Sequence, residues 1–280
     1  MTILGIPAGE FAVLVGAVLI AGTLTGLFAG LLGIGGAAIS VPVMYEVFRV
    51  LGVPDEVRIQ LCVGTALALI VPTSIRSYFA HRAKGAVDDR ILKIWALPIV
   101  VGVGIGSFIA YFASATVFKM LFVIFATLMA LKLLFGRESW RLGQELPGTG
   151  AIAAVGLVIG TISALMGIGG GAYSVLFLTL YGVSIHRAVA TSAGVGVLIS
   201  VPGVIGYMIA GWPQQALMPP LSVGYVSFLA VLLFSPTSVL AAPYGAKLAH
   251  SWPRRRLEVA FAIFLLIVAV RFFASLMKWF

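Results

Sequence analysis

The stretch Gly26-Leu-Phe-Ala-Gly-Leu-Leu-Gly-Ile-Gly-Gly-Ala-Ala-Ile-Ser40 decides the fold, because the chain contains a second version of it. That version is Gly160-Thr-Ile-Ser-Ala-Leu-Met-Gly-Ile-Gly-Gly-Gly-Ala-Tyr-Ser174. In both, an apolar helix with small residues at every fourth position leads into a Gly-Ile-Gly-Gly break, and a second apolar helix follows. The sequence therefore predicts one duplicated unit, with repeats over residues 1–135 and 150–280 joined by a cytoplasmic linker at 136–149.

The composition is that of a polytopic membrane protein. The 280 residues are 61% hydrophobic and only 10% charged, whereas soluble domains average about 25% charged residues. The charge-free runs at 11–43 and 150–181 exceed the ~20 residues that cross a bilayer. We expect an all-α fold in the lipid bilayer of the cell inner membrane. The net charge of +9 lies mainly in short loops and indicates orientation rather than a nucleic-acid partner.

The distribution of basic residues predicts which loops face the cytoplasm. Residues 81–93, 136–149 and 247–256 are rich in Lys and Arg, whereas the turns at 113–118 and 211–220 are poor in them. Basic loops remain in the cytoplasm, so the first glycine-broken element starts and ends outside and the second starts and ends inside. This is an inverted-topology repeat, an arrangement common in secondary transporters.

The number of membrane crossings stays open at this level. If each broken element is a re-entrant hairpin, the chain has six spans and two hairpins. If each is two full crossings, it has ten spans. Both choices preserve the inversion, because each returns the chain to its starting side. Eight crossings would need one element of each kind, which the internal symmetry disfavours.

The two breaks predict a binding site for an anion. Irregular backbone at membrane depth is tolerated only where protein buries it or water reaches it, and paired breaks in matching positions point to a substrate site. Helix N-termini offer bare amides and about half a positive charge. The predicted substrate-binding residues are Gly35, Gly36, Ala37, Ser40, Gly169, Gly170, Gly171 and Ser174. The alternative is that the glycines serve only packing, and we favour it for Gly22, Gly26, Gly156 and Gly160.

A polar path to this site is predicted near two prolines inside spans. Each proline leaves a backbone carbonyl without its helical partner. The candidate pathway residues are Thr65, Pro72, Thr73, Ser74, Arg76, Ser192, Ser200 and Pro202. The alternative for the hydroxyls is a hydrogen bond to their own helix, and for Arg76 it is an anchor at the membrane interface.

The remaining charged residues do not indicate catalysis. The middle of the predicted spans holds neither Asp nor Glu, which weakens any carboxylate proton relay. Arg271 is expected to extend its side chain from a helix end to the interface. We predict no enzyme activity, cofactor or metal, because no catalytic or metal-binding spacing is present. Coupling to H⁺ or Na⁺ is left open.

Four segments resemble the sulfite exporter TauE/SafE family of membrane permeases. They are the two Gly-Ile-Gly-Gly elements at 26–36 and 160–170, the loop His81-Arg-Ala-Lys-Gly-Ala-Val-Asp88, and the segment from Gly224-Tyr-Val226 to Pro253-Arg-Arg-Arg256. The second half has no counterpart of the 81–88 loop, which suggests that this loop is not part of a symmetric site. The resemblance implies movement of small sulfur-containing or organic anions.

The sequence thus predicts a transporter, expected to export an anion such as sulfite or sulfoacetate by alternating access of two inverted repeats. Its expected partners are the small anionic substrate and the lipid bilayer. Two alternatives remain: an anion-selective channel and a membrane scaffold or assembly factor that moves no solute.

Overall fold

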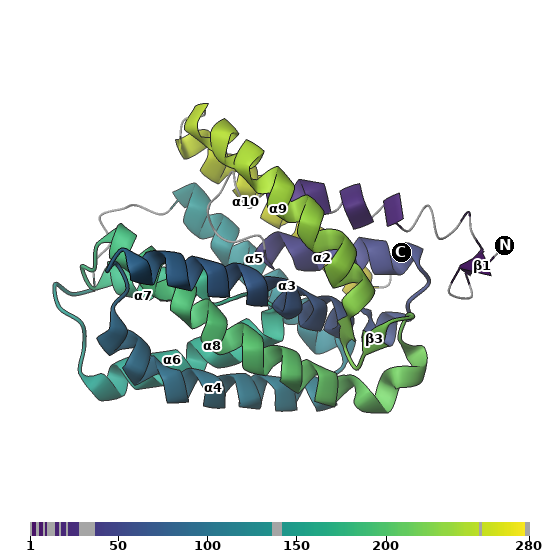
Figure 1. Cartoon of the computed structure of the whole chain (residues 1–280), viewed down its shortest axis with the longest axis horizontal. Coiled ribbons are helices and arrows are strands. Elements are labelled where there is room, and N and C mark those ends of the chain that lie inside the picture. The colour runs from purple at the N-terminus through teal and green to yellow at the C-terminus, as the bar shows by residue number, and fades with distance from the viewer. Residues whose placement is uncertain are drawn as a thin grey trace.

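The computed structural model describes residues 2–3, 6–7, 9, 15–16, 18–20, 22–27, 37–135, 142–251 and 254–277 (Figure 1). The glycines of the first break, among them Gly35 and Gly36, therefore lie outside the described residues. Two short antiparallel hairpins pair β1 (Thr2–Ile3) with β2 (Ile6–Pro7) and β3 (Ser222–Val223) with β4 (Val226–Ser227). The rest of the secondary structure is helical, which confirms the all-α prediction.

The helices follow the order that the duplication predicts. After helical residues at 18–20 and 22–27, the first unit contains α2 (Ala37–Val50), α3 (Asp55–Ala83), α4 (Asp89–Phe112) and α5 (Ala115–Phe135). The second contains α6 (Thr149–Met166), α7 (Gly171–Leu180), α8 (Ile185–Gly211), the 3₁₀-helix η1 (Trp212–Leu217), α9 (Phe228–Ser251) and α10 (Arg254–Leu276).

Six helices among the described residues are long and apolar enough to cross a membrane, namely α3, α4, α5, α6, α8 with η1, and α10. Half-helices α2 and α7 are shorter, with 14 and 10 residues, or ~21 and ~15 Å at 1.5 Å per residue. A hydrocarbon core of about 30 Å is too thick for α7 to cross. The α6–α7 element is therefore a hairpin, and the ten-span alternative does not describe it.

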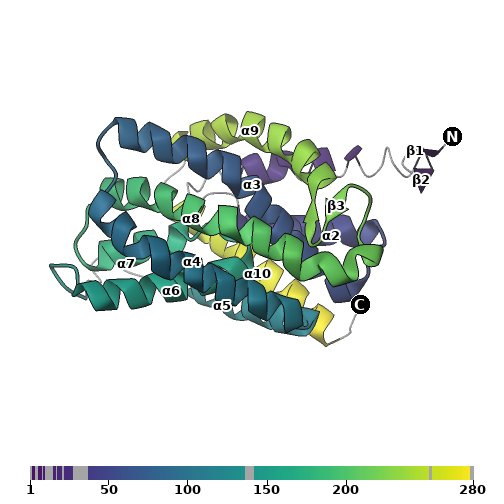
Figure 2. The same ribbon diagram turned by 60° about the horizontal axis from the view of Figure 1, so that its bottom comes forward.

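The two broken elements open toward opposite ends of the molecule. The amide of Leu142, before α6, donates to the carbonyl of Leu180 at the end of α7 (2.9 Å), so that element begins and ends on one side. Val18 instead lines a pocket with the turn at 51–54 and the loop at 216–220, at the other end. Figure 2 shows the same separation, with α7 and α2 pointing apart. We call the end with 51–54 and η1 the outer end, following the predicted orientation.

The turns that follow the two half-helices have the same backbone structure. Gly52 and Gly182 both have positive φ, 72° and 81°. The amides of Val53 and Val183, one residue later, each close the preceding helix with a 3.0 Å bond to the carbonyl of Phe48 and of Leu178. Glycine is favoured at such a left-handed C-terminal position because it has no Cβ. The duplication is therefore visible in geometry as well as in sequence.

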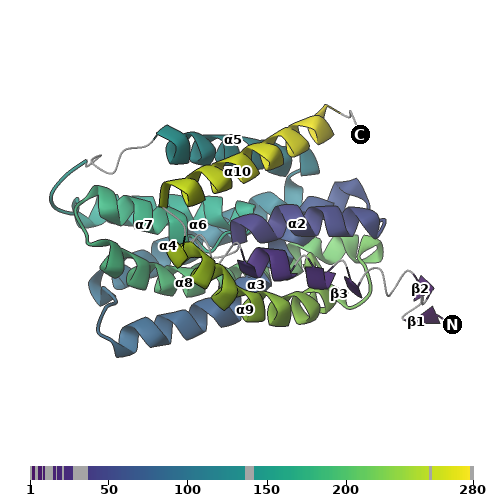
Figure 3. The same ribbon diagram turned by 90° about the horizontal axis from the view of Figure 1, so that it is seen from above.

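Corresponding helices of the two units run antiparallel. Arg187, at the start of α8, pairs with Asp88, which follows α3 (3.3 Å), so the end of α3 and the start of α8 share one side. Arg255, at the start of α10, donates to the carbonyls of Leu133 and Leu134 at the end of α5. Figure 3 shows α5 and α10 side by side along one edge of the molecule. This is the inversion that the basic loops predict.

The first helix of each unit packs on the other unit. A Cβ on Gly22 or Gly26 would overlap the backbone of α9, at Phe234 and Ser238. A Cβ on Gly160 would overlap the carbonyl of Ile99 in α4. These glycines therefore permit close helix packing, as small residues do in membranes. The packing interpretation of Gly22, Gly26, Gly156 and Gly160 is confirmed, with Gly156 facing the Trp95 ring.

Candidate functional site

The second break is a four-residue turn, residues 167–170, between α6 and α7. Gly167 ends α6 in the left-handed region (φ 65°, ψ 27°), and its amide donates to the carbonyl of Ser163. Gly170 precedes α7 with φ 68° and ψ −3°. A side chain at either position would strain the backbone, because L-residues rarely adopt positive φ. The two glycines thus reverse the chain within the membrane protein's interior.

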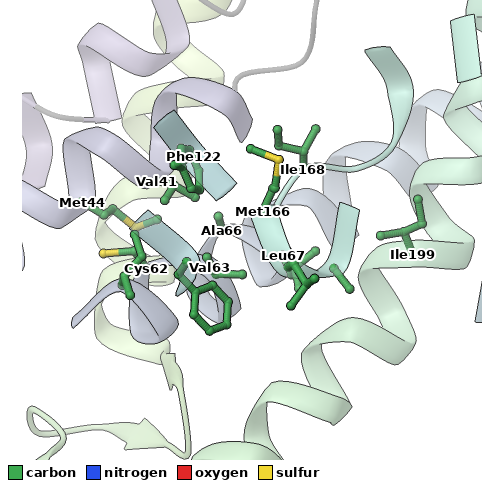
Figure 4. Packing of buried hydrophobic residues seen from close by; sticks show 14 of the residues in the cluster. Val41, Met44, Cys62, Val63, Ala66, Leu67, Phe122, Met166, Ile168 and Ile199 are labelled. Atoms are coloured by element: carbon green, nitrogen blue, oxygen red, sulfur yellow. The ribbon is translucent and has the colours of Figure 1, made fainter. Parts of the chain in front are cut away.

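The break is enclosed by helices of both units. A Cβ on Gly167 would lie 3.0 Å from the carbonyl oxygen of Val63 in α3. One on Gly170 would overlap Ile199 of α8, and one on Gly169 would lie 3.1 Å from Ile70 of α3. Figure 4 shows Met166 and Ile168 among side chains of α2, α3, α5 and α8 at this place. The break therefore sits at the contact between the two repeats.

The start of α2 lies beside this break. The side chain of Val41, in the second turn of α2, approaches the Cβ position of Gly167 to 3.1 Å. Ala37, a predicted site residue, is the first residue of α2. The two half-helices therefore begin in one region of the interior, although Gly35 and Gly36 lie outside the described residues.

The N-terminus of α7 has no side-chain cap. Gly170 provides no side-chain hydrogen bond to cap the helix, and the first amides of a helix have no partner within it. At Gly171 the nearest atom to a Cβ would be the hydroxyl oxygen of Ser192, at 3.9 Å. Gly171, Ala172 and Tyr173 are partly accessible. The geometry combines bare amides, a positive dipole end and a nearby hydroxyl.

The two predicted serines of the half-helices are buried. Ser174 is fully buried, and its hydroxyl donates to the carbonyls of Gly170 (2.8 Å) and Gly171 (3.2 Å). Ser40 is 4% exposed. The hydroxyl of Ser174 thus bonds to the backbone of its own helix, which is the common arrangement of Ser and Thr in membrane helices.

Three predicted pathway serines lie close to the break. Ser74 and Ser200 bring their hydroxyl oxygens to 3.5 Å across the α3–α8 contact. A Cβ added to Gly196 of α8 would lie 2.9 Å from the Cβ of Ser74 and 3.6 Å from the carbonyl oxygen of Gly169. Ser74 is therefore close to the break. Ser192 flanks Gly171, and its hydroxyl donates to the carbonyl of Val189 (2.8 Å).

The other pathway candidates are placed differently. Thr65 is fully buried and accepts a hydrogen bond from the amide of Ser227 (3.0 Å), so it ties α3 to β4. Pro72, Thr73 and Arg76 are exposed, and Pro202 is half-buried. Thr73 donates to the carbonyl of Ile70 (2.9 Å). The exposed residues share a face of α3 that turns away from Ser74.

A buried cation was missed in the sequence. Lys119 in α5 is 3% exposed, and its ammonium group contacts both carboxylate oxygens of Asp55 (2.6 and 2.9 Å). The signal was present, since Lys119 has only apolar or uncharged neighbours in the sequence. Arg271 was expected to extend to the interface, and its Nε pairs with Glu46 of α2 (3.0 Å). Helix packing supplies a carboxylate that the linear pattern does not reveal.

Comparison with known proteins gives a consistent result. Residues 18–272 match the family described as "Sulfite exporter TauE/SafE". A "Probable membrane transporter protein" of Haemophilus influenzae is 34% identical over 259 residues, which is 91% of this chain and 96% of that protein. "Probable membrane transporter protein MJ0441" of Methanocaldococcus jannaschii is 27% identical, over 89% and 92%. "Probable membrane transporter protein YunE" of Bacillus subtilis is 25% identical, over 92% and 96%.

No solved structure matches the chain. The family match nevertheless covers most of the sequence, including the α6–α7 hairpin, and the relatives align over nearly their full length. With its apolar spans, the protein is a multi-pass membrane transporter. The chain belongs to the sulfite exporter TauE/SafE family.

Proposed function

We propose that this transporter exports a small sulfur-containing oxyanion or organosulfonate, such as sulfite or sulfoacetate. The observation that carries the proposal is the uncapped N-terminus of α7, held inside the protein at Gly170 and Gly171. The family description as a sulfite exporter supports both the substrate class and the outward direction.

The chemistry of the site fits a small anion of this class. Sulfite and sulfonate groups carry several acceptor oxygens, and the first amides of a helix are donors without partners. The donors proposed on the second break are the amides at Gly169, Gly170 and Gly171. The Ser192 hydroxyl lies beside Gly171 and donates to the carbonyl of Val189. By the internal symmetry, Gly35, Gly36 and Ala37 are the matching donors of the first break.

Transport then follows from the arrangement of the two units. The site lies where α2, α3 and α8 enclose the break, and α3 and α8 are corresponding helices of opposite direction. Rocking of one repeat against the other would expose such a central site to each side in turn. In the proposed orientation the basic loops at 81–93, 136–149 and 247–256 face the cytoplasm of the inner membrane.

Transport assays with purified protein in liposomes test this proposal. We expect saturable movement of radiolabelled sulfite or sulfoacetate, with competition by thiosulfate and other small sulfur anions but not by neutral solutes. Imposed H⁺ and Na⁺ gradients identify the coupling ion. An electrical conductance for the anion that does not depend on an H⁺ or Na⁺ gradient would instead identify a channel. The absence of any anion flux would show that the protein does not transport this substrate class.

A further inference from the structure

The outer end of the molecule contains an ionic network centred on the buried ammonium group of Lys119. Besides its two contacts with Asp55, the ammonium group donates to the hydroxyl of Ser275 in α10 (3.0 Å). A lysine with 3% exposure in an apolar helix is costly unless its charge is compensated, and ionisable residues at such places usually have a function.

Four helices meet at this network. From α2, the hydroxyl of Tyr45 donates to Asp55 (2.6 Å). From α3, the guanidinium of Arg58 contacts Asp55 (3.3 Å) and donates to the carbonyl of Val53 (2.7 Å). A second ion pair, between Arg271 of α10 and Glu46 of α2, also joins these elements (3.0 Å). Through Lys119, α5 therefore joins the network that Asp55 forms with Tyr45 and Arg58.

Helices α5 and α10 pack mainly on each other, and we call this pair the α5–α10 body. They pack along each other (Figure 3), with the rings of Phe122 and Phe272 5.4 Å apart. The central helices α3, α4, α6 and α8 pack mainly among themselves. Asp55, at the first turn of α3, thus bonds across the boundary between the two bodies.

The ion pairs at the two ends of the molecule differ in burial. Near the cytoplasmic loops, Arg187 and Asp88 pair at 3.3 Å. Each pair has one exposed side chain, Arg187 (59%) or Asp55 (54%), but the Asp88 side chain is 19% exposed and that of Lys119 only 4%. Exposed ion pairs contribute little to stability. The position in α10 that corresponds to Lys119, the fifth residue of the helix, is Glu258. The pair with a buried ammonium group at the outer end is therefore a specific feature of the first unit.

We propose that the Lys119–Asp55 pair is a latch that holds the α5–α10 body against α3 at the outer end. The latch must part for the outer end to open. This inference rests on the proposed alternating-access transport. Asp55 is suited to the role because its side chain is 54% exposed, so water can hydrate the carboxylate when it separates.

Reversible cross-linking tests the latch during transport. Asp55→Cys and Lys119→Cys are combined in a Cys62→Ala background and joined by a short, reducible, thiol-specific reagent. We expect at least a tenfold loss of sulfite transport on cross-linking and recovery on reduction. The matched control, Phe122→Cys with Phe272→Cys, lies within the α5–α10 body and should keep its transport when joined. Undiminished transport by the cross-linked Asp55–Lys119 pair would overturn the latch.

A distance measurement tests the latch without any substrate. Spin labels at Glu56→Cys and Met120→Cys report the separation of α3 and α5, and labels at Met120→Cys and Phe273→Cys serve as the control within one body. Lys119→Met removes the charge at similar volume, and we expect a second, longer α3–α5 distance with the control distance unchanged. A single unchanged α3–α5 distance in a folded Lys119→Met protein would refute the latch. If the unmodified protein transports no sulfur anion, the proposed function fails while this measurement still decides the latch.

Discussion

Neighbouring glycines have different structural roles in this protein, which follow from their φ angles and from the space around them. Gly170 needs a positive φ and has no room for a side chain, since a Cβ would overlap Ile199. Gly171, one residue later, has ordinary helical geometry, and the nearest atom to its Cβ position is 3.9 Å away. A change at Gly170 would disturb folding as well as binding, whereas Gly171 offers a test of the site alone.

Gly171→Val should weaken anion binding without preventing insertion. The side chain would cover the first amides of α7, and the loss of one hydrogen bond to a charged group costs about 1.5–3 kcal/mol, or at least about tenfold in affinity. Titration with sulfite, followed by intrinsic fluorescence or calorimetry, measures the effect. Gly104→Val is the control, because a Cβ there meets nothing within 4 Å. Equal affinity of both variants would remove α7 from the site.

Two neighbouring residues on α3 show why the pathway could not be assigned from sequence. Ser74 is buried and faces Ser200, whereas Thr73 is exposed. In a soluble protein the polar face of a helix marks the exterior. In lipid the exterior is as apolar as the core, so hydroxyl spacing alone does not distinguish a residue beside the site from one on the outer surface.

At the scale of elements, two short half-helices and their breaks set the architecture. Half-helices α2 and α7 end in matching glycine turns, and the first helix of each unit packs on a long helix of the other unit. Because the first helix of each unit packs on the other unit, as α6 does on α4, neither unit can form these contacts alone. The stability of the whole fold therefore depends on small residues at these crossings.

Gly160→Leu should destabilise the folded transporter. Its side chain would overlap the backbone of α4 at Ile99, and overpacking of this kind costs about 1–3 kcal/mol, occasionally more. The thermal midpoint in detergent, measured by a fluorescence melt, should fall clearly. Gly104→Leu, which points into open space, should leave the midpoint close to that of the unmodified protein. A similar midpoint for both would contradict the proposed tight crossing.

At the scale of the whole molecule, the antiparallel relation of the units determines which loops share a side. The loop after α3 and the start of α8 meet through Asp88 and Arg187. The turn after α2 lies at the opposite end, beside the loop at 216–220. The predicted repeat boundaries at 135 and 150 remain predictions.

Cysteine labelling of intact cells tests the orientation. In a Cys62→Ala background, Gln214→Cys in η1 should react with a membrane-impermeant maleimide, because it is exposed at the predicted outer end. Lys84→Cys, in the basic loop, should react only after the cells are opened. The reverse pattern would invert the proposed orientation and, with it, the direction assigned to each opening.

The membrane setting, the duplication, the glycine breaks and the inversion could all be predicted from the sequence. These properties depend on composition, on local backbone requirements such as positive φ at Gly170, and on the charge of loops. The residues that face the break, and the contact of Lys119 with Asp55, 64 positions away in the sequence, became known from the packed fold. Such contacts depend on the depth and rotation of packed helices, and a uniformly apolar helix carries no periodic signal for either.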